Sequence, residues 1–451
     1  MIHPVDLSPV VQSGPVHLPG QLEYSIATTP WNVAVAQQPA LVGVPRSEGE
    51  LVTMVREAVA HGLRIAPQST GHAASALTPD ALDGALLLRV HEYTGVTVDP
   101  VRRTARIVGG TLWRDVLATC APHGLTALHG SAGDVSAIGF LLGGGLSFYS
   151  RAHGLGTSAV RAFDVVTSDG DVRRASSEEN PDLFWALKGG GGSFGTVIAV
   201  EIDLLPFTDV VAGMMLWDIG AAAQIVPAWI AWSANAPETA TTSLRLMNFP
   251  PLPELPDFLR GRRLVVIDGA VLADDDAAAE ILAPLRDLAP EMDTVGRIPA
   301  AALLAVHMDP PGPTPTVTDH ALLGPLTAEA AGAFVDAGTA ADSSLMFAEL
   351  RHLGGALARP IDAALDRVDG DYALFTASIA ATPELAARGL ADTSAVVSAM
   401  GPWSTGRALS NFDERPRSGA GAFPADTYAR LLRIRKAYDP LGAWVAARPV
   451  E

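Results

Sequence analysis

Lysine and cysteine are almost absent from this 451-residue chain, and each shortage excludes a class of chemistry. Only Lys188 and Lys436 could form a Schiff base, and both have an ordinary place at the end of a predicted helix. The single cysteine, Cys120, permits neither an intrachain disulfide nor a cysteine-based metal site. The eleven histidines show none of the spacings that are typical of metal ligands, so we expect no metal.

Positive charge is scarce as well, because 31 basic residues stand against 49 acidic ones and the net charge is −18. Such a chain would repel nucleic acid and anionic membranes, so we expect neither as a partner. No run approaches the roughly 20 apolar residues of a membrane helix. Residues 1–20 lack the basic stretch and apolar run of a signal peptide. Together these absences predict a cytoplasmic protein.

Apolar residues are abundant, at 48% of the chain, and the length is sufficient for two domains. Residues 1–207 alternate strand-like and helix-like segments. Ser47 and Glu50 form a capping box that opens a helix, and Gly62 closes it between strand-like residues 41–45 and 63–67. Asn180-Pro181 predicts the start of a second helix, which is followed by a strand at 196–205.

The character of the sequence changes after residue 207. Residues 244–249, 264–272, 346–353 and 372–380 predict strands of a mixed or antiparallel sheet that helices cover. A last helix is expected at about 426–438. We therefore predict an α+β protein with a first domain at 1–207, an inserted domain at 208–395, and a segment, 396–451, that returns to the first domain.

Two glycine-rich segments indicate a ligand. In the first, Ala66 to Ala74, Gly71 permits backbone conformations that other residues avoid, and successive N–H groups of such a turn can hold a phosphate. His72 within it reads, on its own, as an ordinary loop histidine. In the second, His129 to Gly145, the density of glycines suggests backbone close to a flat or phosphorylated ligand, although tight packing explains it equally well.

A third glycine-rich segment excludes one familiar fold. Gly190, Gly192 and Gly195 match the dinucleotide-binding pattern G-x-G-x-x-G. That pattern needs a strand before it and a helix after it, whereas here a helix precedes and a strand follows. We therefore reject a Rossmann domain.

In this order, the three segments resemble the vanillyl-alcohol-oxidase/para-cresol-methylhydroxylase (PCMH) superfamily, and within it the berberine-bridge-enzyme-like oxidases. The resemblance extends to Arg151 with Gly154-Leu155, and to Asn411-Phe412-Asp413 and Tyr438-Asp439-Pro440. It implies a PCMH-type FAD-binding domain of two α/β subdomains at 1–207, a substrate-binding domain at 208–395, and a berberine-bridge-like closing segment at 396–451.

The same resemblance implies FAD bound covalently through His72. Many relatives add a cysteinyl link, but that position falls on Ala132, and Cys120 lies in a predicted helix at 111–121. We expect a single histidyl link, as in the 6-hydroxy-D-nicotine-oxidase-like members. Gln68 replaces the arginine usual in the family, so one positive charge near the cofactor is lost. The implied FAD-binding residues are Pro67, Gln68, Ser69, Thr70, Gly71, His72, Gly130, Ser131, Ala132, Gly133, Ser136, Gly139, Gly143, Gly144, and, near the adenine, Val197 and Val200.

The catalytic candidates are Arg351, His352, Tyr372 and Asn411. Strand alternation places Glu349 and Arg351 on one face of the inserted sheet and His352 on the other. Glu349 with Arg351 could equally be a structural pair, and His352 a satisfied sheet histidine. Tyr372 could act as a base if its pKa is lowered, and Asn411 lies near the flavin by resemblance.

The predicted reaction is the oxidation of an alcohol, phenol, amine or natural-product intermediate, with hydride passing to FAD. O2 would reoxidise the flavin and form H2O2. The expected partners are this substrate and O2, and the protein itself would be a monomer or homodimer. Two alternatives remain: an oxygenase or redox-neutral cyclase of secondary metabolism, and a protein that uses a covalent flavin to sequester a drug-like compound.

Overall fold

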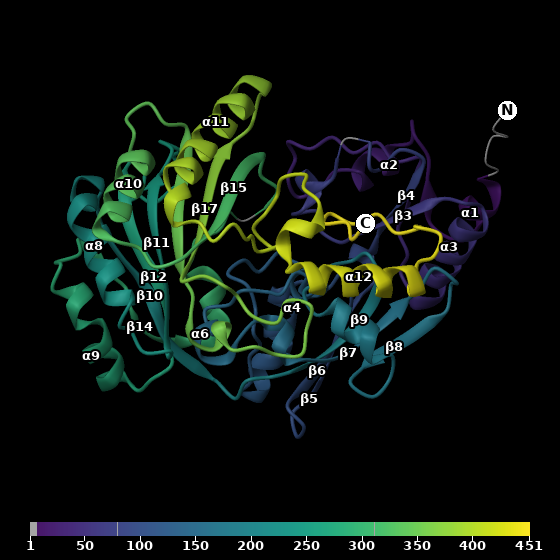
Figure 1. The fold of residues 1–451 in the computed structure, drawn as a ribbon, viewed down its shortest axis with the longest axis horizontal. Coiled ribbons are helices and arrows are strands. Elements are labelled where there is room, and N and C mark those ends of the chain that lie inside the picture. The colour runs from purple at the N-terminus through teal and green to yellow at the C-terminus, as the bar shows by residue number, and fades with distance from the viewer. Residues whose placement is uncertain (1–6, 79, 311) are drawn as a thin grey trace.

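Three β-sheets with helices around them make up the computed structural model, which describes residues 7–78, 80–310 and 312–451 (Figure 1). Residues 1–6, in the segment for which we expect no signal peptide, lie outside the described residues. The strands are β1 (Val16–His17), β2 (Leu41–Gly43), β3 (Arg64–Gln68), β4 (Ala85–Arg89), β5 (Thr94–Asp99), β6 (Thr104–Gly109), β7 (Val160–Val166), β8 (Val172–Ser176), β9 (Thr196–Asp203), β10 (Asp209–Asp218), β11 (Ala240–Asn248), β12 (Arg263–Val271), β13 (Met292–Asp293), β14 (Gly296–Pro299), β15 (Thr316–Leu323), β16 (Leu345–His352) and β17 (Tyr372–Ile379). The α-helices are α1 (Ser8–Gln12), α2 (Leu22–Ala27), α3 (Glu48–Ala60), α4 (Trp113–Cys120), α5 (Ala137–Leu142), α6 (Ser150–His153), α7 (Pro181–Leu187), α8 (Ala222–Ser233), α9 (Asp275–Arg286), α10 (Ala328–Gly338), α11 (Pro383–Ala399) and α12 (Ala425–Tyr438).

The first sheet, in the order β1-β2-β4-β3, contains the predicted β-α-β unit. Strands β2 and β3 both pair with β4 in parallel, and α3 connects them. One half of the capping box is confirmed, because the Ser47 side chain accepts a hydrogen bond from the Glu50 amide. In the other half, Glu50 Oε2 accepts from the amide of Arg46 at 2.8 Å, one residue before Ser47. Leu51, Met54 and Val55 of α3 are fully buried and hold it on the sheet.

The second sheet, β5-β6-β9-β7-β8, is antiparallel throughout. The helix predicted at Asn180-Pro181 is α7, but the Asn180 side chain does not cap it. Asn180 takes a left-handed conformation, φ 46°, and its amide donates to the Arg174 carbonyl at 2.7 Å. The predicted last helix is α12, which packs against α7 on the side of the two smaller sheets (Figure 1).

The third sheet has eight strands, β13-β10-β12-β11-β16-β17-β15 with β14 beside β10, and all pairs are antiparallel. Of the two predicted possibilities the mixed sheet is therefore wrong. Helices α8, α9, α10 and α11 cover one face (Figure 1). Strands β10 and β15 were not predicted. Leu244, Leu350 and Leu374 point toward the helices, and Arg245 and Glu349 point to the opposite face, which packs toward the first half of the chain.

The predicted α+β class is confirmed. The domain boundaries at 207 and 395 stay predictions. Among the described residues, no helix combines the length and the apolar character that a bilayer span requires. The same residues contain no cluster of three side chains that could hold a metal ion.

Candidate cofactor and substrate site

His72 lies on the turn that follows β3, at the meeting point of two loops. Its imidazole stacks on Trp31 with a centroid distance of 4.3 Å, and Nε2 lies 3.4 Å from the Asp134 carbonyl oxygen. Gly71 before it has φ +85°, and a Cβ there would lie 2.7 Å from Pro30 Cβ, so the turn requires glycine. The backbone therefore fixes where the imidazole points.

The imidazole of His72 is neutral near pH 7. Burial lowers the pKa of His72 and outweighs the opposing effect of the carboxylates of Asp134 and Asp309. A neutral imidazole keeps a lone pair on one ring nitrogen. This is the state that a nucleophilic histidine needs.

The second loop, residues 129–136, packs directly beside the first. Asp134 Oδ2 accepts a hydrogen bond from Trp31 Nε1 at 2.7 Å. Ala132, at the position where relatives have a cysteine, is in this loop, whereas Cys120 is fully buried at the end of α4. Part of the glycine density is due to packing, because a Cβ on Gly130 or Gly145 would meet the Phe140 ring at 3.0 or 2.4 Å.

The two loops fit a phosphorylated, flat cofactor. Within the described residues, the backbone amides of Thr70, Gly71 and His72 and those of residues 130–135 donate no hydrogen bond. The hydroxyl of Ser136 is also buried without a partner. Backbone amides without a partner are the donors that a bound phosphate uses.

The other predicted cofactor residues lie around this place. Pro67 and Gln68 end β3, and Ser69 donates to the Gly110 carbonyl at 3.3 Å. Val197 and Val200 are in the core on β9, with 6% and 1% exposure, so their side chains are closed to a ligand. The remaining residues, Ser131, Gly133, Gly139, Gly143 and Gly144, follow the second loop into α5 and the turn after it.

Asn411 brings the last part of the chain to the triple glycine. Its Oδ1 accepts from the Gly145 amide at 2.9 Å, and its Nδ2 donates to the Phe140 carbonyl at 3.1 Å. A Cβ on Gly143 would lie 2.6 Å from the Asn411 amide nitrogen, so the glycine allows this close approach. The structure therefore places Asn411 against the predicted cofactor loops.

A group of buried ionisable side chains lies on the inner face of the third sheet, opposite its helices. We call these five residues the charged cluster: Arg245, Asp268, His307, Glu349 and Arg351. Asp268 accepts hydrogen bonds from Arg245 and from Ser243 Oγ, the latter at 2.7 Å, and His307 Nδ1 lies 3.1 Å from its Oδ2. The other ring nitrogen of His307 lies 3.3 Å from Glu349 Oε1.

Arg351 is the member of the charged cluster nearest to the solvent, with 14% of its side chain exposed. Its guanidinium lies 2.9 Å from Glu349 Oε1 and stacks over the Phe412 ring at 5.0 Å, next to Asn411. Burial alone would raise the pKa of Asp309, but His307, Arg351 and the Ser131 hydroxyl lower it overall, so the carboxylate is ionised. Asp309 thus connects the cluster to the loop that contains Ser131.

His352 and Tyr372 lie on the opposite, helix-covered face, as the alternation predicted for His352. His352 contacts Arg151 at 2.5 Å and stacks on Tyr372, whose hydroxyl lies 2.8 Å from Ser233 Oγ of α8. Burial raises the pKa of Tyr372, so the lowered pKa that a phenolic base needs is not met. Burial and the Arg151 charge lower the pKa of His352 to about 2. The structure brings Arg351 and Asn411, but neither His352 nor Tyr372, to the side of His72.

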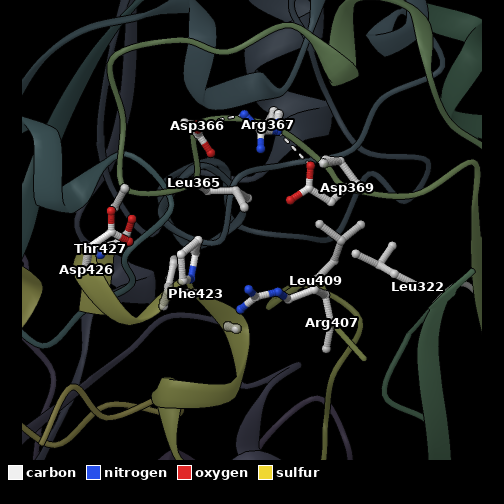
Figure 2. Close-up of a pocket in the computed structure, with 15 residues that line it drawn as sticks. Leu322, Leu365, Asp366, Arg367, Asp369, Arg407, Leu409, Phe423, Asp426 and Thr427 are labelled. Carbon is white, nitrogen blue, oxygen red and sulfur yellow. Dashed lines mark hydrogen bonds and ion pairs between the residues drawn. The ribbon is translucent and has the colours of Figure 1, made fainter. Parts of the chain in front are cut away.

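A cavity of about 320 Å³ lies between residues 364–369 and the C-terminal segment. Figure 2 shows the ion-paired Asp366, Arg367 and Asp369 on one side of it and Arg407 and Phe423 on the other. Leu365, in its wall, would also meet a Cβ on Gly144 at 2.6 Å. The cavity therefore borders the triple-glycine turn through Leu365.

Sequence reasoning missed several residues of this site. Asp268 directly follows the apolar run Val265 to Ile267, and a charge within an apolar strand was the available signal. Arg89 of β4, which contacts Gln68 beside the first loop, follows three leucines and gave the same signal. His307 and Asp309 lie in an irregular segment, and no pattern in the sequence indicated them.

Comparison with known proteins agrees with this site. Residues 39–176 match the family described as FAD binding domain. The chain is 31% identical over 211 residues to (R)-6-hydroxynicotine oxidase from Paenarthrobacter nicotinovorans. These aligned residues are 47% of this chain and 46% of that protein. It is 32% identical over 184 residues to xylooligosaccharide oxidase from Thermothelomyces thermophilus, 41% of this chain and 37% of that protein. The chain thus matches less than half the length of these curated relatives.

Solved structures match over nearly the whole chain. BBE-like 1 from Physcomitrella patens has a TM-score of 0.86 at 18% identity and covers 98% of each chain. Glucooligosaccharide oxidase from Acremonium strictum, whose FAD is 6-S-cysteinyl and 8α-N1-histidyl, has a TM-score of 0.81 at 20% identity and covers 98% of each. 6-Hydroxy-D-nicotine oxidase from Arthrobacter nicotinovorans has a TM-score of 0.80 at 22% identity and covers 95% and 96%. Residues 39–176 therefore match an FAD-binding domain, and the fold of the whole chain is the one these solved structures share.

Proposed function

We propose that this protein is an FAD-dependent oxidase that attaches its flavin through His72 alone and oxidises a small organic substrate. The observation that carries the proposal is the position of His72, between two loops whose amides are free to bind phosphate. Its lone pair would form a bond to the flavin 8α-methyl carbon in place of one C–H bond. That C–H and the imidazole N–H would give up two protons, and the two electrons released would pass to the flavin ring and from it to O2, which forms H2O2. Stacking on Trp31 and the contact with Asp134 would hold the ring in place for that bond.

A single link is supported by the side chains present. Ala132 has no nucleophile, and Cys120 is buried in the core that α4 forms with the second sheet. Burial raises the pKa of Cys120 to about 11, so a thiolate is disfavoured there. The covalent bond of His72 would then be the whole attachment.

The bound flavin would take a hydride from the substrate and reduce O2 to H2O2, so that the substrate loses two electrons and two protons and O2 gains them. Substrate and O2 are thus the proposed partners. Arg351, held in place by Glu349 and Phe412, would orient a substrate oxygen or nitrogen. It would do so from the third sheet, on the side of the site opposite the two cofactor loops. We propose Asp309 as the acceptor of the substrate proton because its carboxylate lies between the charged cluster and the loop that contains Ser131. Tyr372 is the poorer candidate, because its hydroxyl lies 2.8 Å from Ser233 on the helix-covered face.

Flavin fluorescence on a denaturing gel tests the attachment. The wild type should give a fluorescent band, His72→Ala should give none, and His123→Ala, a variant of an exposed histidine, should match the wild type. A wild type without fluorescence would refute the covalent bond.

Oxygen stoichiometry tests the reaction class with a panel of alcohols, amines and phenols. An oxidase should release one H2O2 per O2 consumed and reduce the flavin when O2 is absent. An oxygenase would place label from O2 in its product, and a redox-neutral cyclase would consume no O2. A sequestering protein would bind compounds while its flavin stays oxidised, and this result would overturn the proposal.

A further inference from the structure

Arg89 is a buried cation with no anion beside it. It ends β4 with only 7% exposure, and no carboxylate lies within ion-pair distance of it among the described residues. Its Nη1 donates to Gln68 Oε1, while its Nε is buried without a partner. Burial lowers the pKa of Arg89 to about 10, which still leaves it charged at neutral pH. A buried charge without a counterion is costly, so its retention indicates an anion that the chain itself does not supply.

The guanidinium lies beside the loop whose amides are free. Gln68 and Arg89 are directly paired in the parallel register of β3 and β4. Gln68 Oε1, which Arg89 contacts, lies 3.1 Å from where a Cβ on Gly71 would be. Only the side chain of Gln68 therefore separates this positive charge from the turn that has the free amides of Thr70, Gly71 and His72.

The charge pattern explains the departure at position 68. Gln68 is neutral where the resemblance implies arginine, and its side-chain oxygen accepts a hydrogen bond from the guanidinium of Arg89 on the neighbouring strand. A guanidinium is well suited to phosphate because its N–H groups form a planar fork. The positive charge that β3 lacks at position 68 is thus supplied by Arg89 of β4.

We propose that Arg89 pairs with the pyrophosphate of FAD and takes the place of a basic residue at position 68. This inference rests on the proposed function for its ligand, FAD, but not on the covalent bond or on the oxidase reaction. Gln68 acts as a positioning residue that orients the guanidinium.

The test measures flavin affinity in the His72→Ala background, where any flavin is held without a covalent bond. Fluorescence titrations with FAD and with riboflavin compare His72→Ala alone with versions that also carry Arg89→Gln, Arg89→Lys or the exposed control Arg102→Gln. Arg89→Gln should weaken FAD binding by about 10- to 100-fold, as expected for a hydrogen bond to a charged group. Riboflavin, which has no phosphate, should lose less than about twofold, Arg89→Lys should recover part of the FAD affinity, and Arg102→Gln should change nothing.

Two results would overturn the inference. One is an FAD affinity of the Arg89→Gln protein equal to that of the Arg102→Gln control. The other is an equal loss for riboflavin and FAD, since that would show general damage to the fold. Thermal unfolding of the flavin-free protein separates the cases further: removing an unpaired buried charge should not lower its midpoint, whereas removing a structural arginine would. If wild type proves to lack a covalent bond, the same titrations are made with His72 intact, so the two proposals fail independently.

Discussion

The charged cluster allows a stability prediction that can be worked out from its geometry. Asp268 is its centre: the side chain is fully buried and has three polar partners, Arg245, His307 and the Ser243 hydroxyl. Arg245 and His307 hold the pKa of the Asp268 carboxyl far below its usual range, although burial acts in the opposite direction. Asp268→Asn keeps the volume but removes the charge, and Arg245 is left as a buried cation without a counterion.

Breaking a buried pair from one side costs about 3–5 kcal/mol. We expect Asp268→Asn to lose that amount in the free energy of unfolding, measured by urea denaturation followed by tryptophan fluorescence. Asp275→Asn is the matched control, since Asp275 pairs with Arg297 at 2.8 Å but is 71% exposed. Such an exposed pair contributes about 0–1 kcal/mol.

The double variant Asp268→Asn with Arg245→Met should recover part of the loss, because no unpaired charge then remains. An Asp268→Asn protein within about 1 kcal/mol of the wild type would refute this account of the cluster. The account would also be refuted if adding Arg245→Met to Asp268→Asn lowered the free energy of unfolding further, by the full cost of a second independent substitution.

Two further predictions concern carboxyl groups near the site. Burial raises the pKa of Glu414 to about 7, so the folded state binds the proton of this carboxyl more tightly than the unfolded state does. The contribution of Glu414 to stability should therefore fall as pH rises from about 4.5 to 7. Glu414→Gln should abolish that decline in thermal melts across this range, and an unchanged pH profile would contradict the assignment. Asp309→Asn should slow substrate-driven flavin reduction by about 100-fold or more in stopped flow, as expected for loss of a general base; flavin content and reoxidation by O2 should stay normal, and an unaltered reduction rate would exclude Asp309 as the proton acceptor.

The sequence allowed the cofactor half of the site to be predicted more fully than the substrate half. Residues of the cofactor loops are consecutive, so Gly71, His72 and Ala132 could be recognised from short motifs. The capping box of α3 was visible for the same reason, since its two side chains lie three residues apart.

The substrate half depends on contacts between distant strands, which no local pattern reports. Arg245, Asp268 and His307 meet only because β11, β12 and the segment after β14 converge on one face. Alternation correctly separated Arg351 from His352 but could not say which face has the helices. Tyr372 was therefore chosen as a base without knowledge that α8 buries its hydroxyl.

The strand that leads into His72 is bordered by the far end of the chain. Ile65 of β3 donates to the Ala443 carbonyl at 2.7 Å and accepts from the Val445 amide at 2.8 Å, and Asn411 fastens the glycine turn from the same region. Residues 443–445 follow β3 by hundreds of residues in the chain, so a ribosome makes them long after β3 has emerged. The cofactor loops thus gain these neighbours late in synthesis, and a flavin that requires the complete site would be captured late as well.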